Sequence, residues 1–72
     1  SLNENIRYKV KENEVLLNTA LNGNYTVYNI SASKVSGGKF TFGENVLPLS
    51  GKGFYIINLS SGTESYSFKV RL

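Results

Sequence analysis

Hydrophobic and polar positions alternate with a period of two along most of the chain. Over residues 6–11, apolar and basic residues take turns, so a strand places Ile6, Tyr8 and Val10 on one face and the cations on the other. The same alternation returns over residues 66–72. Both segments are predicted to be half-buried β-strands.

Turn-forming residues separate several more short runs that are rich in β-branched and aromatic residues. Asn22-Gly23 is the strongest short turn motif of the chain, and Gly37-Gly38 and Gly62 mark further turns. Residues 15–21 lack helical spacing, so at most one helical turn is expected there. Pro48 is expected at the edge or end of a strand. Turns every 8–12 residues or so indicate an all-β antiparallel sandwich or small barrel of seven or eight strands.

Residues 54–59, Phe-Tyr-Ile-Ile-Asn-Leu, form the most apolar run of the chain. Apolar side chains fall on both faces of this run, rather than on alternate positions. Strands that are buried on both faces have this pattern. The segment is therefore predicted to be a central strand covered on both sides.

The composition removes most catalytic and metal chemistry. The chain has no Cys and no His, and all five acidic residues are Glu. A disulfide framework and a Cys/His zinc site are excluded, and the usual nucleophile–base constellations lack their parts. Glu12 and Glu14 could offer oxygens to a hard cation, but no loop of alternating oxygen ligands surrounds them. We expect neither an enzyme nor a cofactor or metal site.

The positive charges fall on two strands. Eight Lys and Arg against five Glu give a net charge of +3. Arg7, Lys9 and Lys11 share one strand face, and Lys69 and Arg71 share another. If the two strands are neighbours, these five cations form one patch for phosphate, anionic glycolipid or nucleic acid. The competing interpretation, favoured by the modest net charge, is that outward cations keep sheet edges from aggregating.

Aromatic residues follow the strand alternation and are expected mainly in the core. Five Tyr and four Phe are present, without Trp. Tyr25 and Val27 face one way, whereas Tyr28 and Ile30 face the other, so one of the two tyrosines should be partly exposed.

Three segments carry a resemblance to a known family. Residues 27–35 contain an expected strand with a tyrosine, a short turn, and Lys34-Val35 at the start of the next strand. Residues 49–59 contain Gly53-Phe54-Tyr55 at the start of an apolar strand. Gly62 and the closing segment 68–72, with its lysine, follow. In this order, residues 13–72 resemble the C-terminal sorting domains of proteins exported by the type IX secretion system of Bacteroidetes. Ala32 stands where the family has Gly, and the Pro-Asn-Pro opening of type A members is absent.

The resemblance implies a fold and a role. The fold is an immunoglobulin-like β-sandwich of about seven strands, a single domain over residues 1–72 at the C-terminus of a larger secreted protein. The implied role is that of an address, which we expect the machinery to recognise in the periplasm. The domain is then expected to direct the cargo across the outer membrane to the surface or the medium. Contact with anionic lipopolysaccharide and weak homodimerisation by edge-strand pairing are also expected, and binding to nucleic acid is not. The implied recognition residues are Gly53, Tyr55, Gly62, Lys69, Val70, Arg71 and Leu72.

Two other classes of function remain open from the residues. One is a small immunoglobulin-like adhesion or carbohydrate-binding module of a bacterial surface protein. It is favoured if deletion of residues 68–72 leaves export intact and a glycan array shows binding. The absence of Trp weakens it. The other is a nucleic-acid-binding five-stranded barrel, which needs exposed aromatics beside the basic strands and a steep salt dependence of binding.

Overall fold

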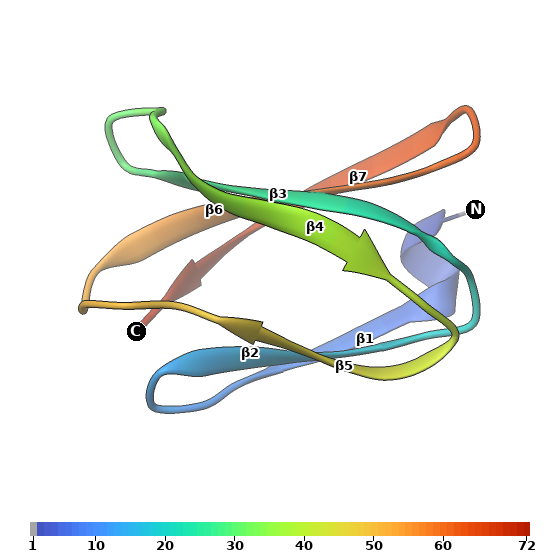
Figure 1. The fold of residues 1–72 in the computed structure, drawn as a ribbon, viewed down its shortest axis with the longest axis horizontal. Helices are drawn as coiled ribbons and strands as arrows, with labels where there is room; N and C mark the ends of the chain where they lie inside the picture. Colours follow the sequence, from blue (N-terminus) through green and yellow to red (C-terminus); the bar gives the residue numbers. More distant parts are fainter. Residues whose placement is uncertain (1) are drawn as a thin grey trace.

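A computed structural model describes residues 2–72 and shows two antiparallel β-sheets packed face to face (Figure 1). Sheet A has the order β1-β2-β5, and sheet B has the order β4-β3-β6-β7. The elements are η1 (Leu2–Asn5), β1 (Ile6–Val10), β2 (Glu14–Thr19), β3 (Gly23–Asn29), β4 (Lys34–Phe40), β5 (Gly43–Pro48), β6 (Phe54–Ser61) and β7 (Glu64–Arg71). This confirms the all-β immunoglobulin-like sandwich of seven strands. Relative to a constant-type immunoglobulin domain, β4 pairs with β3 instead of β5.

The core lies between the two sheets and is built from alternate positions of the strands. Period-two patterning places Phe68 and Val70 of β7 inward, whereas in β1 only Ile6 is buried and Tyr8 and Val10 are 44% and 38% exposed. Thr19 is the one buried polar side chain in the described chain, and its hydroxyl bonds the backbone of Leu21. The side chains with least exposure are Leu2, Val15, Leu17, Val27, Phe40, Leu47, Ile57 and Leu59.

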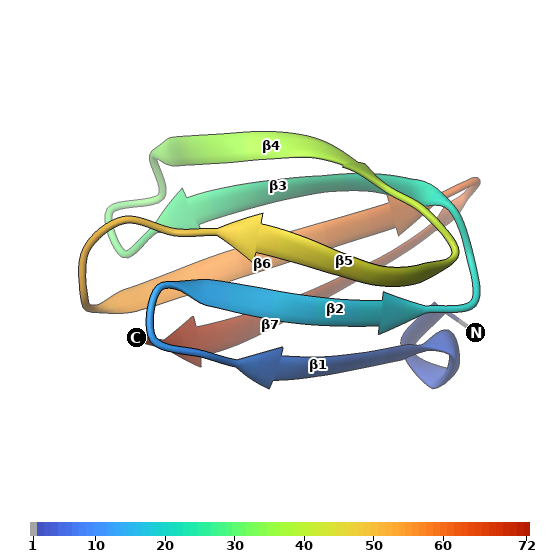
Figure 2. The same ribbon diagram turned by 60° about the horizontal axis from the view of Figure 1, so that its bottom comes forward.

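The turn expected at Gly37-Gly38 is wrong, because both residues lie inside β4. Residues 15–21 contain no helical turn, in line with their spacing, because β2 continues to Thr19. The Asn22-Gly23 segment connects the two sheets. It joins β2 of sheet A to β3 of sheet B (Figure 2). Asn22 is held there from both sides, since its carbonyl accepts the Ser61 hydroxyl at 2.6 Å and its Oδ1 accepts the Phe42 N–H at 2.8 Å.

The prediction that residues 54–59 are covered on both faces is wrong. β6 is central in its sheet, between β3 and β7, and Tyr55, Ile57 and Leu59 are buried. Phe54 and Ile56 on the other face are 43% and 38% exposed. A sandwich of two layers has nothing to place on the outer face of either sheet, so an apolar run in β6 necessarily leaves part of its side chains at the surface.

The first and last strands meet along one side of the sandwich. Tyr8 of β1 stacks on Phe68 of β7 with ring centroids 4.1 Å apart, although the two strands belong to different sheets. At one end of this side, the Leu2 N–H donates to Glu64 Oε1 at 2.6 Å, which ties η1 to the start of β7. No helix among residues 2–72 has the length and apolarity to cross a bilayer.

The turn between β3 and β4 contains the one non-glycine residue with positive φ in the described chain. Ala32 has φ 65°, a left-handed conformation. Asn29 organises the turn, because its Oδ1 accepts the N–H groups of Ser31 at 2.9 Å and Ser33 at 3.0 Å. Where the resembling family carries Gly, this chain therefore keeps the backbone conformation that Gly adopts most easily.

Ala32→Gly is expected to stabilise the fold. An L-residue in the left-handed conformation costs about 1–2 kcal/mol, and Gly removes this cost. Part of the gain is lost, because Gly also has more conformational freedom in the unfolded chain. The net rise in the free energy of unfolding should be about 0.5–1 kcal/mol, measured by urea titration. Ala32→Val should lower it, because β-branched residues tolerate this conformation worst. A loss of stability in Ala32→Gly would show that the turn does not hold the left-handed conformation in solution.

Candidate recognition site on the β6–β7 hairpin

Six of the seven predicted recognition residues lie at the open end of the β6–β7 hairpin. Gly53 and Leu72 extend the pairing beyond the strands, since the Leu72 N–H donates to the Gly53 carbonyl at 2.8 Å and the Gly53 N–H donates back at 3.2 Å. Tyr55 pairs with Val70 one step further along. Gly62 lies at the opposite end, in the closed turn of the hairpin, so the structure does not bring it near the others (Figure 1).

Lys69 and Arg71 flank the exposed ring of Phe54 on the outer face of sheet B. The Lys69 Nζ is 5.1 Å and the Arg71 Cζ is 5.8 Å from the centroid of this ring. Arg71 is the direct cross-strand neighbour of Phe54. Cations held over an aromatic face are attracted by its quadrupole. The two charges therefore have a defined place at the surface.

β7 is an edge strand, and Lys69 and Arg71 present their backbone at its free edge. In an antiparallel ladder, hydrogen-bonded pairs alternate with non-bonded pairs. Leu72 and Gly53 exchange both bonds, so the next bonded pair is Val70 with Tyr55, and the groups of Lys69 and Arg71 point away from β6. No other strand of the described chain pairs with β7. An extended segment could add here by strand pairing.

Val70 and Tyr55 have their side chains inside the sandwich. They are 4% and 8% exposed, and Leu72 is half-buried against the same core. The Tyr55 hydroxyl donates to the carbonyls of Ser50 at 2.6 Å and Gly51 at 3.1 Å. This is the tyrosine corner of immunoglobulin-like domains, a Tyr at the start of the sixth strand bonded to the loop before it. These side chains hold the site in place, whereas their part in recognition stays a prediction.

Tyr55→Phe is expected to lower the free energy of unfolding by about 1–2 kcal/mol. The change removes the hydroxyl that satisfies the 50–51 carbonyls and keeps the packing of the ring. Chemical denaturation followed by circular dichroism measures the loss. Tyr28→Phe, on the outer face, is the control and should change stability by less than about 0.5 kcal/mol. Equal effects of the two substitutions would contradict a corner role for Tyr55.

Gly53→Ala is expected to destabilise through its backbone alone. Gly53 has φ 130°, a region that residues with a Cβ rarely adopt. A Cβ built there has no neighbour within 4 Å, so crowding is not the cause. The free energy of unfolding should fall by about 1–3 kcal/mol in Gly53→Ala, and by at least as much in Gly53→Val. A melting temperature unchanged by either substitution would show that the loop turns in another way.

The five predicted cations do not form one patch. β1 and β7 are neighbours, but Tyr8 and Phe68 turn toward each other across the sheets. Strand alternation then places Arg7 and Lys9 on the outer face of sheet A and Lys69 on the outer face of sheet B. Arg7 and Lys9 therefore point to the opposite side of the sandwich from Lys69 and Arg71, and Lys11 lies just beyond the end of β1.

Three exposed apolar side chains and the half-buried Tyr28 lie in the part of sheet B that carries Lys69 and Arg71, and strand alternation did not predict them as a group. Tyr28 and Ile30 come from β3 and the turn after it, and Phe54 and Ile56 come from β6. Ile30 is 71% exposed. We call these four residues the apolar patch. The two-sided apolar pattern of residues 54–59 was the available signal, and it was assigned to burial.

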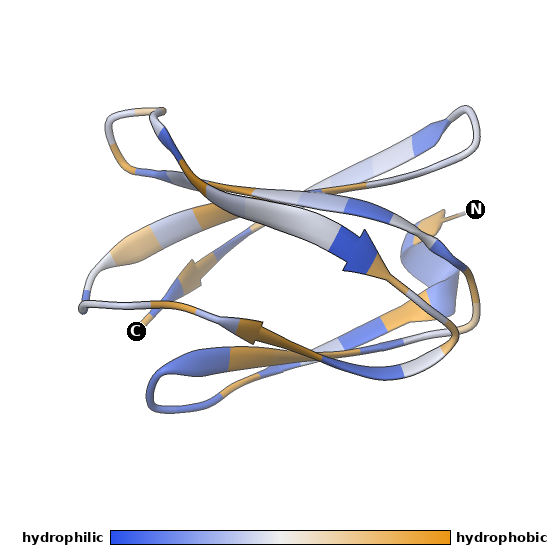
Figure 3. Cartoon of the chain, viewed as in Figure 1, coloured by the Kyte–Doolittle hydropathy of each residue, from blue (hydrophilic) through white to orange (hydrophobic). Residues whose placement is uncertain are grey.

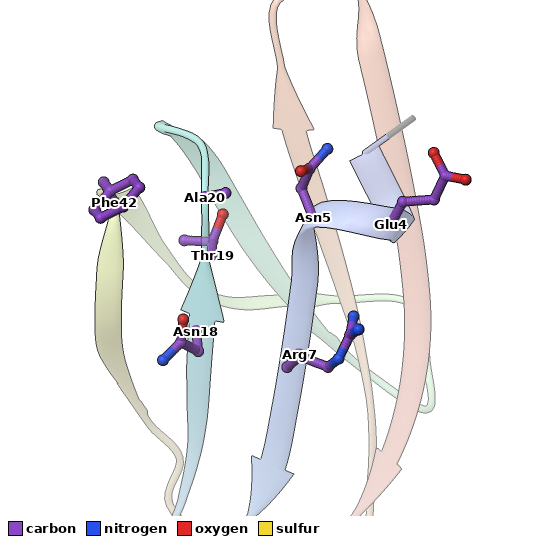
Figure 4. A pocket seen from close by; sticks show the side chains of 7 residues that line it. All are labelled: Glu4, Asn5, Arg7, Asn18, Thr19, Ala20 and Phe42. Carbon is purple, nitrogen blue, oxygen red and sulfur yellow. The ribbon is translucent and has the colours of Figure 1, made fainter.

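A hollow of about 330 Å³ lies beside β1 and β2, away from this site (Figure 4). Figure 4 shows Phe42 and Glu4 on opposite sides of it. The Arg7 Nη1 donates to the carbonyl of Ile6, and Thr19 bonds Leu21, so both polar groups serve the local backbone. Within residues 2–72, no three acidic, His or Cys side chains gather as metal ligands. The hollow is lined by Glu4, Asn5, Arg7, Asn18, Thr19, Ala20 and Phe42.

Comparison with known proteins gives no relative. No protein-family model, no curated protein and no solved structure matches this chain.

Proposed function

We propose that this chain is a non-catalytic sorting domain that the type IX secretion machinery recognises, and that it directs export of an attached cargo across the outer membrane. The observation that carries the proposal is the free edge of β7. It combines unpaired backbone groups with two exposed cations beside Phe54, Lys69 and Arg71, at the segment that resembles the family's lysine-bearing terminal strand.

The physics of edge strands supports recognition by strand addition. Main-chain hydrogen bonds along a free edge supply affinity, and side chains at alternate positions supply specificity. Lys69 and Arg71 alternate with the buried Phe68 and Val70, so the recognised surface is cationic and the core stays closed. The left-handed backbone at Ala32, in the turn where the family carries Gly, is a second point of agreement.

The same edge predicts weak self-association. Two β7 edges can pair antiparallel across a twofold axis, which would join two copies into one continuous sheet. Sedimentation of the 72-residue chain at increasing protein concentration measures this self-association. Lys69 and Arg71 of one copy repel those of the other, so this dimer should be weak. Salt screens the repulsion and should therefore favour the dimer. Contact with lipopolysaccharide remains an expectation from the resemblance.

Charge substitution at the edge tests the proposal. Residues 1–72 would be fused to the C-terminus of a periplasmic reporter in a Bacteroidetes host. Lys69→Gln with Arg71→Gln should reduce the exported fraction about tenfold or more, since hydrogen-bonded charges contribute about 1.5–3 kcal/mol. Lys9→Gln with Lys11→Gln removes the same charge from β1 and the β1–β2 connection and should leave export unchanged. Equal export by the two fusions would contradict recognition at the β7 edge.

A further inference from the structure

The outer face of sheet B places apolar and cationic side chains in register. One cross-strand row runs from Lys34 through Tyr28 and Ile56 to Lys69. Two residues further toward the open end of the β6–β7 hairpin, Phe54 pairs with Arg71. The apolar side chains thus sit in the middle of the face, with cations on both flanks.

Three members of the apolar patch, Ile30, Phe54 and Ile56, are open to solvent, and Tyr28 between them is half-buried. Asn29 pairs with Tyr55, so Ile30, the following residue, lies at the same end of the sheet as Phe54. Figure 3 shows these apolar segments at the start of β6 and in the β3–β4 turn. Ile30 is 71% exposed, and Phe54 is 43% exposed. Exposed aliphatic and aromatic side chains grouped in this way mark a contact surface.

The net positive charge of the molecule is concentrated on this sheet. The one carboxylate of the sheet, Glu64, lies at an inward-facing position and accepts the Leu2 N–H. The remaining charges, outside sheet B, balance, because Arg7, Lys9, Lys11 and Lys52 stand against Glu4, Glu12, Glu14 and Glu44. The charge of +3 therefore comes from the sheet B residues Lys34, Lys39, Lys69 and Arg71 against Glu64.

The chemistry of the patch favours lipid over nucleic acid and over a small ligand. Nucleic acids are bound by aromatic rings that stack on bases, whereas Ile30 and Ile56 are aliphatic and cannot stack. The ring of Phe54 already carries Lys69 and Arg71 at its face. Small molecules occupy concave sites, and the hollows along β1 and β2 lie outside this sheet face. Apolar side chains flanked by Lys and Arg match the interfacial zone of an anionic bilayer.

We propose that the outer face of sheet B docks on the surface of a bilayer that contains anionic phospholipid. Ile30 and Phe54 enter the boundary between headgroups and acyl chains, and Lys34, Lys69 and Arg71 meet the headgroup phosphates. The long aliphatic stems of the cations lie along the apolar patch while their charges reach the phosphates. This inference does not rest on the sorting proposal, because the purified chain is tested without any secretion component.

Vesicle binding tests the charges. The 72-residue chain would be titrated with vesicles of phosphatidylcholine mixed with phosphatidylglycerol and, separately, with pure phosphatidylcholine. Binding is expected only to the anionic vesicles, and it should weaken with salt. A cation near an anionic surface contributes about a fivefold change in partitioning, so Lys69→Gln with Arg71→Gln should weaken binding about 25-fold. Lys9→Gln with Lys11→Gln should weaken it less than about threefold, because both lysines lie outside sheet B and screening limits their effect.

A fluorescent reporter tests the orientation. The chain has no Trp, so Phe54→Trp introduces a single indole on the proposed docking face. Its emission should shift to the blue on anionic vesicles and be quenched by brominated acyl chains. Val46→Trp is the matched control, since Val46 is 53% exposed in sheet A. Its emission should not change. Ile30→Ser should weaken vesicle binding about fivefold while the melting temperature stays constant.

Each of three results would overturn the proposal. The first is no binding of the parent chain to the anionic vesicles. The second is an equal effect of the two double substitutions, or an equal blue shift of the two Trp variants, which would indicate attraction by net charge without a docking face. The third is tighter binding to single-stranded oligonucleotide than to vesicles, weakened by the Lys69 and Arg71 substitutions, which would assign the face to nucleic acid.

Discussion

Gly23→Ala is expected to leave the chain largely unfolded at 25 °C. A Cβ at this position would lie 2.6 Å from the Phe40 Cζ and would overlap the Ser60 carbonyl oxygen. Asn24 pairs with Ser60 in the same stretch, so β3 cannot move away without breaking its ladder with β6. Overpacking against fixed backbone should cost about 3–5 kcal/mol. A single core of this size rarely supplies more than about 3–5 kcal/mol in total.

The backbone contact can be separated from the contact with the ring. Phe40→Leu would make room on the side of the ring, but it leaves the Ser60 carbonyl in place. The double variant Gly23→Ala with Phe40→Leu should therefore stay unfolded, as judged by far-ultraviolet circular dichroism and urea titration. A folded Gly23→Ala chain with the parent's unfolding midpoint would show that β3 and β6 pack less closely than described.

Phe40→Ala is expected to have the second largest effect. Phe40 is 1% exposed and is the largest fully buried side chain of the core. Removing a buried ring deletes its transfer free energy and leaves a cavity, at a cost of about 3–5 kcal/mol. Phe42→Ala, two residues further along, deletes the same atoms from a side chain that is 74% exposed. It should change the free energy of unfolding by less than about 0.5 kcal/mol.

The Phe40 and Phe42 pair gives a sharp thermal test. A loss of about 3 kcal/mol lowers the melting temperature of a domain of this size by roughly 12–24 °C. Similar melting temperatures of the two variants would mean that the sandwich does not close over Phe40 in solution.

Local alternation predicted most of the strands, because it reports which side of each strand is buried. β1 and β7 followed from it directly, and Pro48 ends β5 as expected. The pairing of strands across the two sheets could not be obtained in this way. Asn22-Gly23 has the chemistry of a hairpin turn, yet Gly23 is needed for a close approach of β3 to Phe40 and Ser60. Turn propensity and close packing select the same residue, so the sequence alone does not distinguish them.

The sequence pattern identified residues of the candidate site, but it did not predict how they are arranged in space. Lys69 and Arg71 alternate with apolar residues, so their exposure was expected. The burial of Tyr55 and its bonds to the 50–51 loop depend on how β5 leads into β6, which no local pattern records. The apolar patch was missed because Phe54 and Ile56 resemble core residues of a strand covered on both faces. Only the number of layers shows that their outer face is uncovered.

Apparatus-dependent export is the most direct measurement of the proposed sorting function. A reporter with a signal peptide and residues 1–72 at its C-terminus would be produced in an intact Bacteroidetes host and in a strain without the type IX apparatus. The proposal predicts reporter at the surface or in the medium of the intact host, and in the periplasm of the deficient strain. Retention of the reporter in the periplasm of both strains, with the fused domain folded, would contradict it.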